Sequence, residues 1–187
     1  MKKIVAVLLA VASFAVFSTG AFAADKMTLG ERNFAIKIDS IRFDDSTDDG
    51  VYVGAEGYTE IEKNLYLGAE AGYTSNDGSV QLFGATAASD VIFIPIEMNM
   101  KYAVSVVKHL SFDFGMGGSF NFAKEELSNG DAKDEWLFGG QFFGDINVTI
   151  GKVFLGINGK IQFTDKGKDT GKNYSNKRIG GQIGMIF

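Results

Sequence analysis

Apolar and polar residues alternate along most of the chain from about residue 33 onward. The clearest stretch runs from Ile92 to Val104, where every second residue is apolar and the residues between are mostly small or charged. Successive side chains of a β-strand point to opposite faces of the sheet, so this pattern predicts a strand with one apolar and one polar face. Glycine is frequent (24 residues), which argues against helices.

Seven further segments repeat this alternation, so we expect eight strands. Their approximate ranges are 33–43, 51–59, 64–74, 92–104, 110–122, 136–150, 153–163 and 179–187. In the first of them the alternation slips near Ser40, which we interpret as a β-bulge.

The expected connections alternate between short and long. Short turns are expected near 60–63, 105–109 and 151–152. The connections that are mostly longer and more polar lie near 44–50, 75–90, 123–134 and 164–177. Outer-membrane barrels have short periplasmic turns and longer outer loops. We therefore predict an all-β fold, an eight-stranded antiparallel up-and-down transmembrane β-barrel.

The composition of the two faces favours lipid outside and a filled interior. The polar face is rich in Gly, Ser and Asn, which suits an eight-stranded barrel whose interior is just wide enough for side chains. The apolar face carries aromatic residues near the strand ends, as in the two aromatic girdles of membrane barrels: Tyr102, Phe122, Trp136, Phe163 and Phe187. A soluble β-sandwich, which would also alternate, is the alternative.

Charged residues on the inward face must pair, because an unpaired buried charge costs several kcal/mol. We expect a structural charge network in the lumen, made of Lys37, Asp39, Glu56, Glu70, Glu97, Lys101, Asp113, Asp145 and Lys160. In the hairpin around 105–109, a register in which the numbers of paired residues add up to 214 places Lys101 opposite Asp113. In the hairpin around residue 62, a register that sums to 124 places Glu56 opposite Gly68, so that a large residue lies beside a small one.

The first residues have the form of a secretory signal peptide. Lys2 and Lys3 precede the apolar stretch from Ile4 to Phe17, and Ala21-Phe22-Ala23 follows as a cleavage motif. We expect a signal peptide over residues 1–23 and one outer-membrane β-barrel domain over residues 24–187. An uncleaved anchor is the alternative, but a spanning helix needs about 20 apolar residues.

Charge and cysteine content narrow the function further. The net charge of −5 and the lack of a basic stripe argue against nucleic acid as a partner. Without cysteine, disulfides, zinc-thiolate sites and thiol chemistry are excluded. Nothing in the sequence calls for a cofactor.

Together these features resemble the small eight-stranded OmpA/OmpX-type outer-membrane barrels. The resemblance covers nearly all of residues 24–187 and is architectural. It implies location in the bacterial outer membrane, contact with outer-membrane lipid and lipopolysaccharide, and a monomer. Such barrels typically end in an alternating strand with a terminal Phe that the barrel-assembly machinery recognises, and Ile183, Met185 and Phe187 match this assembly signal.

One motif suggests catalysis. His109 and Ser111 form a His-x-Ser pair that resembles lipid A deacylases, which are also small outer-membrane barrels. A serine hydrolase needs a base oriented by a carboxylate. His109 lies at a short, hence periplasmic, turn, and Glu125 and Glu126 lie at the far end of the same strand. We therefore expect no enzymatic activity.

Two loops carry clustered charges. Asp44, Asp45, Asp48 and Asp49 are weak candidates for divalent cations held among lipopolysaccharide phosphates, with a solvated acidic loop as the alternative. An EF-hand is disfavoured, because the segment departs from the calcium motif at Thr47 and continues into a strand. The expected loop 164–177 contains Lys166, Lys168, Lys172 and Lys177. We expect these lysines either to contact lipopolysaccharide phosphates or to be solvated.

The remaining loop, 75–90, has an apolar tip at Val80 to Phe83, which either extends the barrel as a hairpin or contacts a partner. Our main hypothesis is a non-enzymatic barrel with a role in envelope structure or surface interaction through its outer loops. A narrow pore or conduit for small solutes or hydrophobic compounds is one alternative, and a lipid A-modifying enzyme is another.

Overall fold

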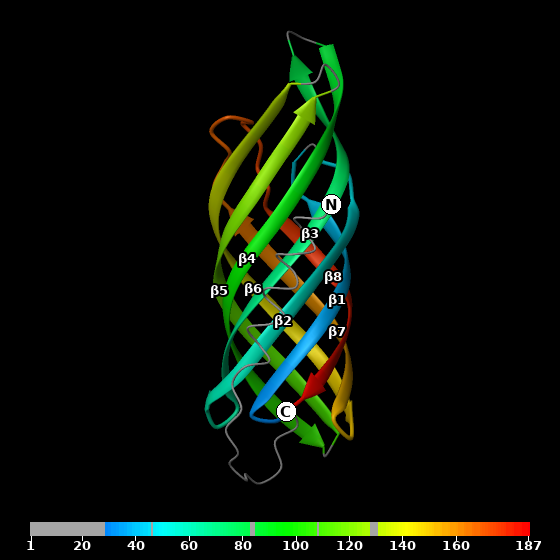
Figure 1. The fold of residues 1–187 in the computed structure, drawn as a ribbon, viewed down its shortest axis with the longest axis vertical. Helices are drawn as coiled ribbons and strands as arrows, with labels where there is room; N and C mark the ends of the chain where they lie inside the picture. The colour runs from blue at the N-terminus through cyan, green and yellow to red at the C-terminus, as the bar shows by residue number, and fades with distance from the viewer. Residues whose placement is uncertain (1–28, 46, 83–84, 108, 128–130) are drawn as a thin grey trace.

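The computed structural model describes residues 29–45, 47–82, 85–107, 109–127 and 131–187 (Figure 1). The expected signal peptide, residues 1–23, lies outside these residues, as do Ser46, Phe83 and Gly84. The described strands form one closed barrel in which each strand pairs with its sequence neighbours and β1 pairs with β8. The strands are β1 (Arg32–Phe43), β2 (Gly50–Glu62), β3 (Leu65–Leu82), β4 (Ala85–Val107), β5 (Leu110–Leu127), β6 (Ala132–Ile150), β7 (Val153–Thr164) and β8 (Asn176–Ile186).

The eight-stranded antiparallel barrel expected from the alternation is confirmed. In the described part of the chain, no helix is long and apolar enough to cross a membrane. The strands β3 to β6 are longer than expected, because segments expected as loops continue to pair in the sheet. The described part of the apolar tip also extends the sheet, with Val80 paired to Ala87 and Leu82 to Ala85.

The two ends of the barrel differ. The short connections β2–β3, β4–β5 and β6–β7 lie at one end together with the C-terminus, and we call this the turn end (Figure 1). At the opposite end, which we call the loop end, the β3–β4 hairpin projects beyond the rest (Figure 1). Gly151 takes a φ of 64° in the β6–β7 turn, a conformation that glycine adopts without strain.

The register of the β2–β3 hairpin corrects the expectation. Glu56 lies opposite Glu70 and not opposite Gly68. The register shifts between Glu60 and Glu62, next to the turn. Glu62 pairs with Leu65, so the turn lies at residues 63–64, beyond the expected centre at residue 62, and the bulge offsets only one residue of this displacement.

The β4–β5 hairpin departs from expectation for the same reason. Lys101 lies opposite Gly115 and not opposite Asp113, and the register shifts between Ser105 and Val107. Lys101 nevertheless reaches Asp113 diagonally, with 3.5 Å between the ammonium nitrogen and a carboxylate oxygen. Long side chains span such diagonal positions in a sheet.

The bulge expected near Ser40 is absent, since β1 pairs with β2 and β8 without a register shift. Ile41 and Phe43 point into the barrel and are buried, on the same face as Lys37 and Asp39. The apparent slip in the sequence therefore marks a change in what fills the interior, from charged to apolar side chains.

Large inward side chains lie over inward glycines, as expected for a narrow barrel. The pairs differ from the expected pair of Glu56 and Gly68. A Cβ atom at Gly54 or Gly72 would collide with the ring of Tyr52, and one at Gly184 would collide with Phe154. The buried core of the molecule is thus the filled barrel interior, whereas large apolar residues on all eight strands face outward and are exposed.

Candidate functional site

The inward side chains form three layers along the barrel axis. The layer at the loop end, which we call the cup, consists of Ile41, Phe43, Tyr52, Val91, Phe93, Ala123, Leu137 and Tyr174. The layer at the turn end, which we call the lower layer, consists of Leu29, Ala35, Tyr58, Tyr66, Ala103, Phe143 and Phe154. The middle layer, which we call the belt, holds the nine charged residues singled out in the sequence together with Arg178.

All nine of those charged residues are buried, and the structure brings them together from several strands. Lys37 lies 2.7 Å from Glu56 and 3.4 Å from Glu70. Lys160 lies 2.6 Å from Glu70 and also pairs with Glu97. Each of these two cations is therefore shared between two carboxylates, which compensate the cost of burying its charge.

Arg178 is the central residue of the belt that the sequence analysis missed. Its guanidinium pairs with Glu97 and lies 3.2 Å from Glu70 and 4.4 Å from the centre of the Tyr52 ring. The signal was present, because Arg178 precedes the inward residues Gly180 and Gln182 at a spacing of two. The expected strand began one residue too late to include it.

The turn-end half of the belt is centred on Lys101. Its ammonium nitrogen lies 3.9 Å from Glu56, 3.5 Å from Asp113 and 4.0 Å from Asp145. The same nitrogen lies 4.0 Å from the centre of the Tyr58 ring. These distances are longer than those around Lys160 and Arg178, so the charge pairing is looser here.

Side-chain amides complete the belt by donating to its carboxylates. Asn158 donates to Asp39 at 3.0 Å, and Asn147 donates to Asp113 at 2.9 Å. These neutral donors supply further partners where the carboxylates of the belt outnumber its cations, and buried carboxylates need such partners. The belt thus crosses the whole lumen as one continuous polar layer.

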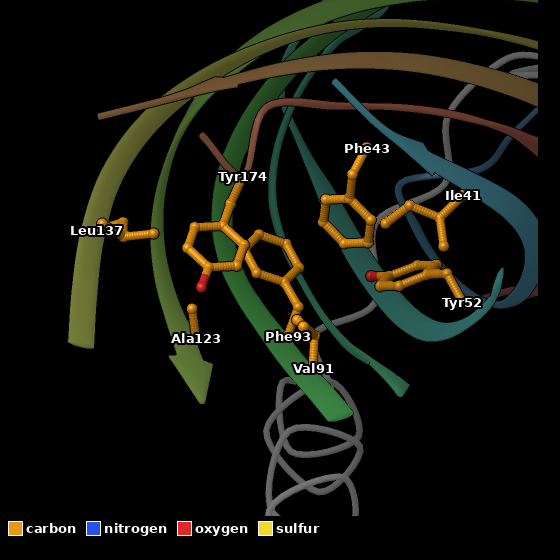
Figure 2. Close-up of a cluster of buried hydrophobic side chains, with 8 residues drawn as sticks. All are labelled: Ile41, Phe43, Tyr52, Val91, Phe93, Ala123, Leu137 and Tyr174. Atoms are coloured by element: carbon orange, nitrogen blue, oxygen red, sulfur yellow. The ribbon is translucent and has the colours of Figure 1, made fainter. Parts of the chain in front are cut away.

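Figure 2 shows the cup, whose side chains come from β1, β2, β4, β5 and β6 and from the segment between β7 and β8. The rings of Phe93 and Tyr174 are stacked, with centroids 6.1 Å apart and an interplanar angle of 11°. Phe43 meets Phe93 edge to face at 5.4 Å. Tyr52 forms the boundary, because its ring belongs to the cup while its hydroxyl donates to Glu70 at 2.8 Å.

Tyr174 comes from the β7–β8 loop, residues 165–175, which we call the lid. The lid is held on the inner side of β5 and β6: Lys172 pairs with Glu125, and Glu135 accepts from the Asp169 backbone at 3.3 Å and from Thr170. Lys172 is therefore buried, contrary to the outer-rim position expected for it. Its long side chain reaches back into the barrel mouth.

The other lysines of this loop behave differently from Lys172. Lys166, Lys168 and Lys177 are exposed. The loop-end acidic residues are also exposed and lie near polar partners: Asp49 pairs with Arg42 at 2.9 Å, and Asp44 with Lys177 at 3.5 Å.

The side chains of Asp45 and Asp48 are exposed at the same loop end. Asp45 accepts a hydrogen bond from the Asn173 backbone at 3.2 Å. Among the described residues, no group of three or more His, Cys, Asp or Glu side chains is placed to hold a metal ion.

The remaining candidates lie near the turn end. His109 is exposed, whereas Ser111 is buried and faces the lumen. Ile183, Met185 and Phe187 are exposed on the outer surface of the barrel. The Phe187 backbone donates to Arg32 at 2.9 Å, so the end of the chain is tied to the start of β1.

Comparison with known proteins identifies the architecture. No protein-family model matches the chain, and no curated protein matches it. Among solved structures, neisserial surface protein A superposes with a TM-score of 0.61 at 11% identity, covering 83% of this chain and 96% of that one. OprG from Pseudomonas aeruginosa gives 0.56 at 11% identity, covering 84% and 97%.

A major outer membrane protein from Thermus thermophilus gives a TM-score of 0.57 at 8% identity, covering 82% of this chain and 99% of that one. These structural neighbours are bacterial outer-membrane barrels. The chain therefore has the fold of the small OmpA/OmpX-type outer-membrane barrels, as the sequence indicated.

Proposed function

We propose that this chain is an integral outer-membrane β-barrel without an open channel, which acts in envelope structure or surface interaction through its loop end. The single observation that carries the proposal is the inversion of the fold: the outside is apolar and the inside holds the charges. The apolar outside supports location in a membrane, and the charged, filled inside supports a closed lumen.

The outer surface supports membrane insertion. Ile38, Met98, Phe138 and Ile179 lie on different strands and are each at least 60% exposed. An apolar surface that surrounds a whole barrel would aggregate in water, since soluble monomers rarely expose patches beyond a few hundred Å². In a bilayer the same surface is solvated by lipid, while the backbone hydrogen bonds are satisfied within the closed sheet.

Aromatic residues support an orientation. Trp136 stacks on Phe120 at 4.4 Å toward the loop end, and Tyr102 contacts Phe114 at 5.8 Å toward the turn end. Two such aromatic bands are typical of the two membrane interfaces. In this orientation the short turns face the periplasm and the loop end faces outward, where Lys166, Lys168 and Lys177 meet lipopolysaccharide phosphates.

The filled interior argues against the pore alternative. The belt places Arg178, Glu97 and Glu70 across the barrel axis with ion pairs between them, and apolar layers lie on both sides. An ion crossing the lumen would have to break these pairs and also enter two apolar layers. The barrel therefore contributes through its surface and its stability in the membrane, and it acts as a monomer.

Single-channel recording in planar bilayers tests this proposal. The unmodified protein is expected to insert without steady, discrete conductance steps. The double variant Glu97→Ala/Arg178→Ala opens the centre of the belt and is expected to raise the current, which shows that insertion is detectable. Folding of both proteins is checked by heat-modifiable migration on a gel. Steady conductance from the unmodified protein would contradict the closed lumen.

The absence of enzymatic activity is part of the same proposal. His109 is exposed at the turn end, on the side opposite the outer leaflet, and Ser111 faces the lumen. Lipid A from cells that express the protein is therefore expected to keep its acyl chains. Faster migration of lipid A, lost in the variant Ser111→Ala, would show a deacylase instead.

A further inference from the structure

We infer that the cup is a binding site for a small neutral molecule with one aromatic ring, and that Tyr174 of the lid occupies this site when no such molecule is bound. Figure 2 shows the ring of Tyr174 inserted among side chains that come from the barrel strands. This inference goes beyond the proposed function, because the cup lies at one end of the lumen and could bind a ligand whether or not the lumen is closed.

The walls of the cup belong to the sheet and do not depend on the lid. Phe43, Val91, Phe93 and Leu137 lie on β1, β4 and β6, whose inward faces are fixed by the barrel ladder. Phe43 and Phe93 already contact each other edge to face at 5.4 Å. If Tyr174 left, an aromatic-lined hollow the size of one ring would remain, and such apolar cavities bind benzene-like molecules.

The lid, in contrast, is joined to the barrel strands by backbone hydrogen bonds only near its two ends. The backbone of Asp165 donates to Phe138 at 2.9 Å, and Asp44 donates to Ser175 at 2.9 Å, close to the two ends of the loop. Within the loop, Gly167 donates to Lys172 at 2.8 Å, so the lid is a small hairpin of its own. It can therefore move as a unit without opening the barrel.

The middle of the lid is fastened through two carboxylates. Glu125 pairs with Lys172, and Glu135 accepts from Asp169 and Thr170. Both carboxylates lie on strands at the rim, above the apolar layer, so their contacts can be exchanged for water when the lid lifts. The closed lid then lowers the apparent affinity for the ligand, because only molecules with an open lid can bind it.

The occupant defines the chemistry of the ligand. Tyr174 places an uncharged six-membered ring parallel to Phe93 at 6.1 Å and edge-on to Phe43 at 6.5 Å. Burial raises the pKa of the Tyr174 hydroxyl, so the group in the cup is a neutral phenol. A charged ring is disfavoured, since the apolar walls would strip it of water without supplying a partner.

The experiment measures binding of p-cresol, which is the side chain of tyrosine as a free molecule, to the folded barrel in detergent micelles. The comparison uses the unmodified protein and the variants Tyr174→Ala, Glu135→Gln and Tyr174→Ala/Ala123→Phe. Binding is followed by titration calorimetry, and folding of every variant is checked by heat-modifiable migration.

Tyr174→Ala is expected to bind p-cresol with saturation and at least ~10-fold more tightly than the unmodified protein, because the competing occupant is gone. Glu135→Gln loosens the lid but keeps the cup and Tyr174, so its affinity is expected to lie between the two. In the double variant, Phe at position 123 refills the cup from β5, and saturable binding is expected to disappear.

The following results would overturn the inference. Equal uptake by all four proteins would mean that p-cresol only partitions into the micelle. A folded Tyr174→Ala barrel that binds no p-cresol would mean that Tyr174 is an ordinary core residue and the cup is not a site. Should Tyr174→Ala fail to fold, Glu135→Gln decides alone, since unchanged affinity relative to the unmodified protein contradicts the role of the lid.

Discussion

The belt and the cup are neighbouring layers of the same lumen, and several strands contribute inward side chains to both. On β1, Lys37 and Asp39 belong to the belt, and Ile41 and Phe43 to the cup. The belt closes the lumen with paired charges, whereas the cup closes it with aromatic rings, one of which comes from a loop. The strand geometry is the same in both layers. The layers differ because charged side chains require ion-pair partners when buried, whereas apolar side chains require only close packing.

This difference determines how each layer responds to change. A buried ion that loses its partner keeps its desolvation penalty, so the belt tolerates the loss of single members poorly. The cup loses only the transfer free energy and the contacts of the atoms removed, together with the cost of the cavity that remains. The belt should therefore be the rigid, stability-determining layer, and the cup the adaptable one.

Replacement of Arg178 by Leu should have the largest effect. It leaves Glu97 and Glu70 without their shared guanidinium, and the loss of one partner from a buried ion pair costs about 3–5 kcal/mol. The free energy of unfolding is measured by urea titration in lipid vesicles, with folded and unfolded protein separated on a gel.

The neighbouring residue provides a matched control. Lys177 pairs with Asp44 at 3.5 Å, but both side chains are exposed, and Lys177→Leu should cost less than about 1 kcal/mol. Equal effects of the two variants would mean that burial of the belt does not govern its energetics.

Lys101→Met should have a smaller effect than Arg178→Leu. The distances from Lys101 to its three carboxylates are 3.5 to 4.0 Å, so we expect a loss of about 2–3 kcal/mol. Adding Asp113→Asn removes one of the stranded charges and should recover part of the loss in the same urea titration. A double variant that is less stable than Lys101→Met alone would show that the charges do not couple in this way.

Nine of the ten charged belt residues stand out in the sequence because they contrast with their surroundings. Lys101, for example, lies between the apolar residues Met100 and Tyr102 in an alternating segment. A charged residue in such a position indicates both a strand and the face of the strand that points inward. Arg178 escaped because it lies at the very start of its strand, and element boundaries are the least certain part of such a prediction.

The cup escaped for a different reason. On β1 the inward residues Ile41 and Phe43 alternate with the outward polar residues Ser40 and Arg42, so the apolar positions change from the outward to the inward face and the pattern resembles a slip. Tyr174 is even less visible, because its place in the lumen depends on a loop that folds back over the mouth. Such non-local contacts leave no periodic signal in the sequence.

The registers of the β2–β3 and β4–β5 hairpins were wrong by two residues for a local reason. Both turns lie further along the chain than expected, since Glu62 pairs with Leu65 and Val107 pairs with Leu110, and the bulge beside each turn offsets only one residue of the displacement. The ion pair between Lys101 and Asp113 survives this shift because a long side chain also reaches a diagonal partner. Facing directions were thus easier to predict than exact partners.

Phe93→Leu tests the adaptable side of the comparison. The substitution removes a stacked ring from the cup but leaves an apolar side chain of similar volume, so it should cost about 1 kcal/mol. The same urea titration in vesicles measures it. A loss as large as that of Arg178→Leu would mean that the cup is as rigid as the belt, and that its occupant cannot be exchanged.

The smallest effect is expected for the same substitution on the outer surface. Phe142 is 56% exposed and lies opposite Met116 and Ile161, and a Leu there meets a bilayer that is as apolar as itself. Phe142→Leu should therefore change the free energy of unfolding in vesicles by no more than about 0.5 kcal/mol, which is usual for surface positions. Phe93→Leu serves as its internal counterpart, because the chemical change is identical and only the surroundings differ. If Phe142→Leu cost more than Phe93→Leu, the outer ring would be packed against protein, and the apolar outside of the barrel would be an interface with another chain in place of a surface solvated by lipid.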